Sequence, residues 1–344
     1  MDGIQIQGEQ HYKEDILPPA EICEISNAGL FGQFDNYAGI ATNDFGTFPI
    51  SWMHLSKPTG HYVSRVGMHI VNFFLKHHAI LLAGNSCAPG YFFPKVDPDN
   101  GWNQFQFIPN QDCGCMVLNI EGIPDSINHG VVFPAEPFMV LSLRNEWNVY
   151  ENYLAAMQSK YRIRANKVFE LSKNIRSKQF SGLEMDDSLI AQCAQLLKET
   201  LRDKIIAMPS NLETVLKYYR AHFGPDFHFN VYYLNDHICG FISWVRLGKS
   251  MMAMQVGYNF LESKETQLYQ RMMHDLIKIG IDNKLEKINL GRTATEIKST
   301  LGAEPLANSF VIYAKSNLLF KCVAFYKKRF YKQTPFTLRS PFKC

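Results

Sequence analysis

The segment 291–299, Gly-Arg-Thr-Ala-Thr-Glu-Ile-Lys-Ser, brings several residue types that can do chemistry close together. Arg292 follows a short strand predicted at 287–290, and at a strand's carboxyl end its guanidinium could hold a phosphate or carboxylate through two hydrogen bonds. The alternative is a salt bridge that braces the loop. Lys298 could neutralise a donor phosphate or an oxyanion, and it could equally be an exposed helix lysine.

Glu296 could act as a general base that takes a proton from an acceptor amine. A carboxylate beside a closed, apolar site can have its pKa raised toward neutrality, which suits that role. The residues Thr293-Ala294-Thr295-Glu296 also fit a capping box, in which Thr293 caps the helix and Glu296 returns to its backbone amide. Capping is the somewhat better fit to the pattern, and one residue could serve both roles.

A second group of candidates ends a strand predicted at 251–258. Tyr258 could protonate a leaving thiolate as general acid, although aromatic packing is the commoner role of such a residue. The expected catalytic residues are therefore Glu296, Tyr258 and Arg292. The expected residues for binding a donor are Lys298, Thr293, Asn259 and Gln255. No metal site is expected, because Cys113-Gly114-Cys115 lacks the spacing and partners of a zinc site.

The elements that must position these residues follow from the hydrophobic periodicity of the second half. Predicted strands at 229–234, 238–247 and 251–258 are separated by turn-forming residues, which is typical of an antiparallel meander. The other predicted elements are strands at 167–172, 287–290 and 310–314 and helices at 187–203, 212–223, 267–283 and 295–301. This order predicts an α/β (α+β) fold with a mixed, mostly antiparallel central sheet flanked by helices. The loops 258–266 and 291–295 should flank its ligand site.

The first half reads as short strands between loops, with a helix at 67–78 and a buried strand starting at 80. A further helix at 149–157 runs into the basic run 160–167, which fits a solvated helix end better than a binding patch. With 344 residues, two domains are the default. We expect an N-terminal half at 1–165, a C-terminal domain at 166–316 and a tail at 317–344.

Several segments of this sequence resemble a known family. Gly240-Phe241-Ile242-Ser243-Trp244, residues 256–259 and especially 290–305 are similar to GNAT N-acyltransferases of the peptidoglycan-biosynthesis-like group. These bacterial proteins are related to the FemAB type, which carries two GNAT-like halves. In the first half, 81–85 and 153–162 share the resemblance. The resemblance implies a tandem GNAT-like fold that transfers an acyl or aminoacyl group from a thioester or ester to an amine, such as a cell-envelope precursor.

The sequence departs from the family at one important place. GNAT enzymes that use acetyl-CoA usually cradle the cofactor pyrophosphate with a glycine-rich loop, and residues 259–266 contain no glycine. No tightly bound cofactor is expected, and the co-substrate is acyl-CoA, an acyl carrier protein (acyl-ACP) or an aminoacyl-tRNA. The alternative is a catalytically silent GNAT-fold binding module for a metabolite or a protein partner.

Composition and charge argue against a DNA-binding, a secreted or a membrane-spanning protein. The formal net charge of +3 is too mild to indicate a DNA-binding surface. The first residues lack the pattern of a signal peptide, and the longest apolar runs, such as 79–83 and 138–143, are too short to cross a bilayer. We therefore expect a cytoplasmic protein, with peripheral contact at the inner face of the membrane as an option. Cys193 and Cys239 lie among apolar neighbours and are expected in the core.

Peripheral contact with the membrane could be made by the tail 317–344, because this segment contains basic and aromatic residues and no acidic residue. Such a segment could lie on an anionic membrane surface or guide an acidic carrier protein. The structural alternative is a helix that packs on the protein itself, and the helical spacing of Leu319, Val323, Tyr326 and Phe330 suits it equally well.

Overall fold

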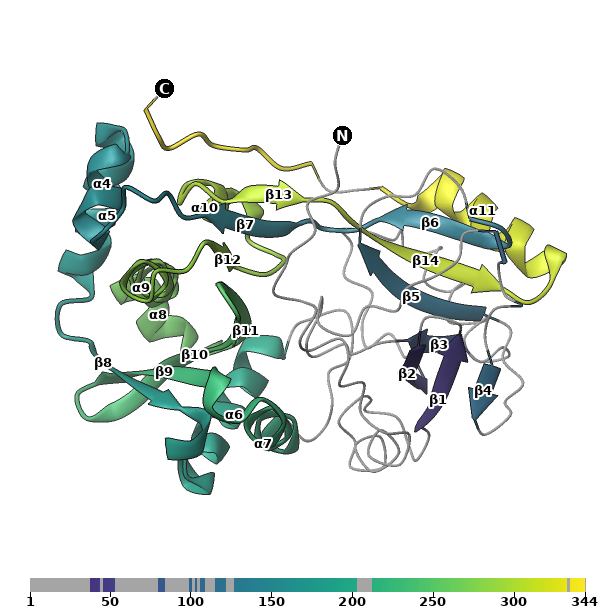
Figure 1. Ribbon diagram of the computed structural model, residues 1–344, viewed down its shortest axis with the longest axis horizontal. Coiled ribbons are helices and arrows are strands. Elements are labelled where there is room, and N and C mark those ends of the chain that lie inside the picture. Colours follow the sequence, from purple (N-terminus) through teal and green to yellow (C-terminus); the bar gives the residue numbers. More distant parts are fainter. Residues whose placement is uncertain are drawn as a thin grey trace.

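The computed structural model describes residues 38–43, 46–52, 80–83, 99–100, 103, 106–108, 115–121, 127–202, 212–332 and 335–343. The strands in these ranges form two seven-stranded sheets, and the helices lie beside them (Figure 1). Both sheets are mostly antiparallel, which confirms the fold class expected from the sequence. The helix expected at 67–78 lies outside the described residues.

The first sheet has the order β4-β1-β2-β3-β5-β14-β6. Its neighbours are antiparallel except for β3 and β5, which run parallel. The helix α11 (Asn317–Phe330) contacts β14 and β6. The strands are β1 (Ala38–Asn43), β2 (Gly46–Trp52), β3 (Ile80–Ala83), β4 (Gln106–Ile108), β5 (Cys115–Glu121), β6 (Gly130–Pro134) and β14 (Asn308–Ala314).

The second sheet has the order β13-β7-β12-β11-β10-β9-β8. Its centre is the expected meander, in which β9 and β10 join through Asn235 and Asp236, two residues with positive φ that suit a tight hairpin turn. The strands are β7 (Phe138–Ser142), β8 (Arg176–Ser181), β9 (Phe227–Leu234), β10 (His237–Leu247), β11 (Ser250–Tyr258), β12 (Lys287–Asn289) and β13 (Glu304–Leu306).

The strands β11 and β12 are the parallel neighbours of this sheet, and their pairing is short. Ser250, Met251 and Met252 face Lys287, Ile288 and Asn289, after which β11 continues to Tyr258 while β12 ends. The register of β11 against β10 also shifts between the pairs Ile242/Val256 and Trp244/Ala253, as in a β-bulge. The two parallel strands are therefore paired only where β11 begins, and β11 extends past the carboxyl end of β12.

Helices cover both faces of the second sheet because β10 buries side chains on both sides. Phe241 and Val245 pack with α6 (Asp187–Leu201) and α7 (Leu212–Phe223) in one core cluster. Ile242 and Trp244, which point the other way, pack in a second cluster with α9 (Leu268–Asp282) and α4 (Tyr150–Ala156). Cys193 and Cys239 lie in these two clusters, as expected.

The strand expected at 167–172 is wrong. That segment belongs to α5 (Ser159–Leu171), and the first strand of the second half is β8, which follows it. Tyr161, Ala165 and Val168 are buried at helical spacing, so the apolar side chains that suggested a strand line one face of a helix. The short helix α8 (Phe260–Thr266), just before α9, was not expected either.

The two sheets exchange strands across the domain limits expected at 165 and 316. The strand β7 comes from the first half and pairs with β12 and β13 in the second sheet. In return, β14 comes from the second half and lies between β5 and β6 in the first sheet. The chain therefore passes between the two units more than once, as Figure 1 shows. No helix in the described part of the chain has the length and apolar character needed to span a membrane.

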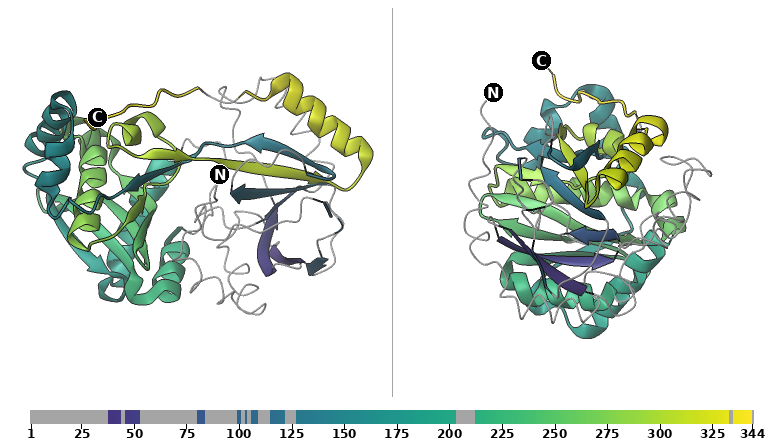
Figure 2. Two further views of the ribbon diagram at one scale, coloured as in Figure 1. Left: turned by 45° about the horizontal axis from the view of Figure 1, so that its top comes forward. Right: turned by 90° about the vertical axis from the view of Figure 1, so that its right-hand side faces the viewer.

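The tail after α11 returns to the second unit, as the left view of Figure 2 shows. There the Phe342 ring packs against Trp147 at 5.2 Å and Tyr153 at 5.8 Å between centroids. The Arg144 guanidinium lies 4.8 Å from the same ring centroid. The Gln158 side chain donates hydrogen bonds to the carbonyls of Ser340 and Phe342. These contacts fasten residues 335–343, here called the C-terminal strap, beside α4 and α5.

We expect Phe342→Ala to lower the free energy of unfolding by about 2 kcal/mol, because it removes an aromatic side chain from a partly buried cluster. Urea unfolding followed by tryptophan fluorescence measures the change, since Trp147 belongs to that cluster. Leu338→Ala on the same strap is the control, because Leu338 is 48% exposed. Equal losses in both variants would contradict the anchoring role of Phe342.

Candidate active site

A cavity of about 440 Å³ lies between α5, α9, α10 (Thr295–Ser299) and the C-terminal strap. This volume is within the usual range for small-molecule sites. Part of its wall is apolar and comes from Met157, Tyr161, Ala165, Val168, Ile297 and Leu301. The polar part comes from Arg164, Lys167, Gln267, Gln270, His274, Glu296, Thr300 and Arg339.

The cavity lies beyond the parallel pair of strands. Gln267 is the residue just before α9, and Gln270 lies in the first turn of that helix. Both come after β11 in the chain. Glu296 and Ile297 belong to α10, the helix that follows β12. Segments that leave the carboxyl ends of neighbouring parallel strands are where open sheets usually bind ligands. The lining contains no residue of the loops 258–266 and 291–295 that the sequence indicated, and it includes the residues that directly follow them, Gln267 and Glu296.

Positive charge dominates the lining. Arg164 and Lys167 are exposed on α5, and Arg339 is exposed on the strap. None of the three side chains has a carboxylate partner within the described ranges, and Glu296 is the carboxylate in this lining. The Arg164 guanidinium lies 5.8 Å from the centroid of the Tyr161 ring. A ligand with one or more anionic groups would therefore gain electrostatically here.

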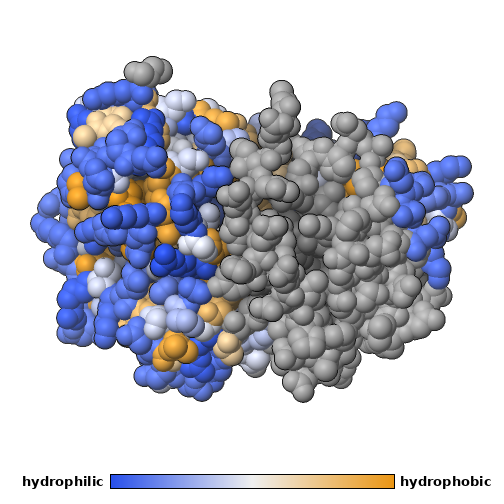
Figure 3. All heavy atoms as spheres, in the orientation of Figure 1, coloured by the Kyte–Doolittle hydropathy of each residue, from blue (hydrophilic) through white to orange (hydrophobic). Residues whose placement is uncertain are grey.

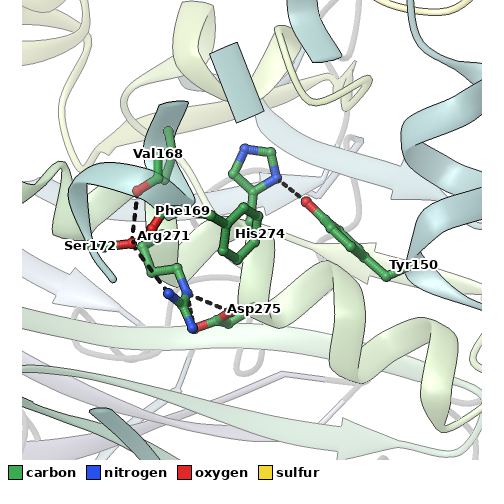
Figure 4. A network of polar contacts seen from close by, with 7 residues as sticks. All are labelled: Tyr150, Val168, Phe169, Ser172, Arg271, His274 and Asp275. Carbon is green, nitrogen blue, oxygen red and sulfur yellow. Dashed lines mark hydrogen bonds and ion pairs between the residues drawn. The ribbon is translucent and has the colours of Figure 1, made fainter. Parts of the chain in front are cut away.

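His274 on α9 brings a neutral imidazole to the cavity. Its Nδ1 lies 2.7 Å from the hydroxyl of Tyr150, and the side chain is 4% exposed (Figure 4). Burial, assisted by the nearby Arg271 charge, lowers the pKa of His274 to about 4. Burial also raises the pKa of Tyr150, so both partners are neutral at pH 7.

A polar network behind the cavity joins α9 to α5 (Figure 4). Arg271 Nε donates to both carboxylate oxygens of Asp275, at 2.9 and 3.0 Å, and the Arg271 guanidinium donates to Ser172 Oγ at 3.2 Å. Ser172 Oγ in turn donates to the Val168 carbonyl at 2.7 Å. The guanidinium also lies over the Phe169 ring, 4.7 Å from its centroid. Because both helices line the cavity, this network fixes the distance between two of its walls.

Glu296 is the expected catalytic residue that lies in this cavity. Its Oε1 accepts a hydrogen bond of 3.1 Å from the backbone amide of Thr337 on the strap. The expected capping box is wrong, because the N-cap of α10 is Ala294, with φ of 50°, and no side chain caps the helix. Thr293 has φ of 65° and is exposed, so the left-handed turn displaces it from the capping position. The Glu296 carboxylate is thus held by the strap instead.

Arg292 and Lys298 support the loop before α10. Lys298 is 3% exposed, and its Nζ donates to the carbonyls of Gly291 at 3.2 Å and Arg292 at 2.6 Å. Burial lowers the pKa of this ammonium group to about 7. The Arg292 guanidinium lies 5.6 Å from the centroid of the Phe138 ring on β7. Neither residue is part of the cavity lining.

The remaining candidates lie along β11 and at its end. Gln255 is buried at the bulge, where its side-chain oxygen accepts from Ser243 Oγ at 3.1 Å. Asn259 caps α8, its Oδ1 accepting from the amides of Leu261 and Glu262. Tyr258 is half-buried beside Tyr269 of α9, and burial raises its pKa. None of these three residues lines the cavity.

The analysis of sequence alone did not select His274, Arg164, Lys167 or Arg339. The basic run 160–167 was noted but attributed to a solvated helix end, and Arg339 is remote in sequence from every other lining residue. The one available signal was the helical spacing of Gln267, Gln270 and His274, which marks one face of α9 with polar groups.

No protein-family model matches the chain, and no curated protein is significantly similar to it. Among solved structures, a conserved protein of unknown function from Bacteroides thetaiotaomicron covers 91% of this chain and 99% of its own, with 8% identity and a TM-score of 0.44. L-PGS from Bacillus licheniformis covers 92% and 98%, with 8% identity and a TM-score of 0.41. FemX covers 59% and 66%, with 10% identity and a TM-score of 0.39. At these values the likeness carries no conclusion about what this chain does.

The depressed pKa of His274 predicts that stability falls in mild acid. The unfolded histidine takes up its proton near pH 6.5 and the folded one only near pH 4, so stability is complete above pH 6.5 and is lost as the pH falls between these values. We expect His274 to account for about 2 kcal/mol of the loss between pH 7.5 and 5.

Urea unfolding at a series of pH values measures this loss, and His274→Gln should flatten the profile by that amount. His237→Gln is the control, because His237 is exposed and paired with Glu262. A profile that is unchanged in His274→Gln would contradict the assignment.

Proposed function

We propose that this protein is an N-acyltransferase that moves an acyl or aminoacyl group from a thioester or ester donor to an amine. The observation that carries the proposal is the cavity beyond the short β11/β12 pair, with Glu296 on one wall and three cations that have no carboxylate partner among the described residues. The sequence resemblance at 290–305 favours the same chemistry. A cell-envelope precursor is one candidate for the amine.

The charge of the cavity fits a donor that carries phosphate. Arginine and lysine bind phosphate oxygens through charge-assisted hydrogen bonds, and Arg164, Lys167 and Arg339 supply three such groups. Acyl-CoA, the phosphopantetheine arm of an acyl carrier protein and an aminoacyl-tRNA all carry phosphate, which in the first two is at the other end of the pantetheine arm from the thioester. The apolar wall then suits the uncharged part of the donor.

In the proposed reaction the amine nitrogen attacks the acyl carbonyl carbon. A C–N bond forms, the C–S or C–O bond breaks, and the proton released by the amine passes to Glu296. The departing thiolate or alkoxide takes up a proton from water, because Tyr258, the residue expected to supply it, does not line this cavity. Arg292 and Lys298 contribute by holding the loop from which α10 starts, and through it the position of Glu296.

A silent binding module remains the second candidate function. It is favoured by the absence of glycine from 259–266 and by the engagement of Glu296 with the Thr337 amide. Such a module would hold its ligand in the same cavity without turnover.

Incubation of the purified chain with acyl-CoA, acyl-ACP and aminoacyl-tRNA, each with a panel of amines, tests the proposal by mass spectrometry. We expect an N-acyl product with one of the donors and transfer that depends on the amine. Donor binding without product across the panel would support the silent module. If no donor binds and no product forms, both candidate functions are contradicted.

With the active donor, we expect Glu296→Gln to lower kcat by at least tenfold, because it removes the proton acceptor and keeps the shape of the side chain. Arg164→Gln and Arg339→Gln should instead raise the KM for the donor by roughly tenfold each, since a charge-assisted hydrogen bond contributes about 1.5 to 3 kcal/mol. Glu265→Gln is the control, because Glu265 is exposed on α8, outside the lining. Unchanged kcat in Glu296→Gln would remove this residue from the mechanism.

A further inference from the structure

The helix α11 packs on the first sheet with one side only. It starts at Ser316, whose Oγ accepts a hydrogen bond from the Leu319 amide, and it contacts β14 and β6. Just after its end, the Tyr331 hydroxyl donates to the Pro134 carbonyl, and the Tyr331 ring meets Phe133 edge-on at 5.0 Å. The residues expected to pack, such as Leu319 and Tyr326, are partly buried. The helix is therefore held in place by its inner side and its end.

The outer side of α11 carries apolar residues that stay largely exposed in the part of the chain that the structure describes. Leu318 is 72% exposed and Phe325 is 62% exposed. Residues seven apart lie two turns apart on the same side of a helix, so these two side chains share one face. In Figure 3, the part of the surface where Figure 1 places α11 is mostly hydrophilic, with some hydrophobic atoms among it.

Cations surround the two apolar side chains. Lys321, Lys328 and Arg329 are exposed, and their helical positions are within about one residue's rotation of Leu318 or Phe325. No ion pair links these three side chains to a carboxylate in the part of the chain that the structure describes. The sequence 317–344 contains no acidic residue, so the charge of this face is not offset from within the segment.

We propose that this face of α11, Leu318, Lys321, Phe325, Lys328 and Arg329, binds the surface of an anionic lipid bilayer. A helix that lies in the membrane interface needs apolar side chains that reach the acyl boundary and cations that meet the lipid headgroups, and this face supplies both. Nucleic acid would use the cations and leave Leu318 and Phe325 in water. The combination of charge and exposed apolar side chains therefore favours lipid.

The arrangement of the elements indicates which side of the protein would face the bilayer. In Figures 1 and 2, α11, the C-terminal strap and α5 lie along one side of the protein. The strap and α5 also supply Arg339, Arg164 and Lys167 to the cavity. Binding through α11 would thus bring the cationic side of the protein toward the bilayer. The proposal stands on α11 alone and does not depend on the acyltransferase function.

Sedimentation of the full chain with phosphatidylglycerol-containing vesicles and with neutral phosphatidylcholine vesicles, at low and high salt, tests the proposal. We expect binding to the anionic vesicles only, weakened by salt. The triple variant Lys321→Gln, Lys328→Gln, Arg329→Gln should bind at least tenfold more weakly, and on the order of a hundredfold if each cation acts fully. The matched control is Lys264→Gln, Lys278→Gln, Lys284→Gln, which removes the same charge from exposed sites on and around α8 and α9.

A single variant, Phe325→Trp, tests the apolar part in the same full chain. We expect its additional fluorescence to shift to the blue with anionic vesicles, because the indole enters the interface. No binding by the full chain, equal losses in the two triple variants, or binding without a blue shift would overturn the proposal. Binding to an acidic carrier protein in place of vesicles would assign the face to that partner.

Discussion

The buried ammonium group of Lys298 holds the loop on which the site depends. The backbone between β12 and α10 takes left-handed conformations at Gly291, Thr293 and Ala294, with φ of 80°, 65° and 50°. Only glycine adopts such values without cost, so two of these residues are strained. Lys298 donates to the carbonyls on either side of the turn's start, and its burial makes those hydrogen bonds strong. The position of α10, and of Glu296 on it, follows from this contact.

The same loop explains why the cavity forms beyond β11 and β12. Because β12 ends after three paired residues, the chain can turn away and place α10 where a longer strand would have continued. The Met139 amide donates to the Gly291 carbonyl, and the Leu290 amide to the Met139 carbonyl, so β7 supports the loop from the other side. A strand contributed by the first half of the chain therefore stabilises the site in the second. The exchange of β7 and β14 ties the shape of the site to the integrity of both sheets.

The parts of the fold that sequence predicted are those with strong local patterns. The helices α6 and α7 and the strands β9, β10 and β11 have clear periodicity and turn residues between them, and their expected limits agree closely with the structure. The periodicity failed at α5, where Tyr161, Ala165 and Val168 were divided between a helix end and a false strand. The partnership of β7 with β12 had no local signal at all, because strand pairing over long sequence distances depends on tertiary packing.

The site was predictable only where one segment carries several of its residues. The segment 291–299 was singled out for catalysis and donor binding. In the structure Lys298 and Ser299 hydrogen-bond to backbone carbonyls of this segment, and Glu296 is its polar residue in the cavity lining. Arg339 reaches the same cavity because Phe342 is anchored among Trp147, Tyr153 and Arg144, a set that comes from the middle of the chain. A strap fixed at α11 by one end and at Phe342 by the other positions Arg339 and the Thr337 amide between two anchors. The polarity of the cavity is thus determined by aromatic packing at a distance from it, which a reading of local sequence cannot detect.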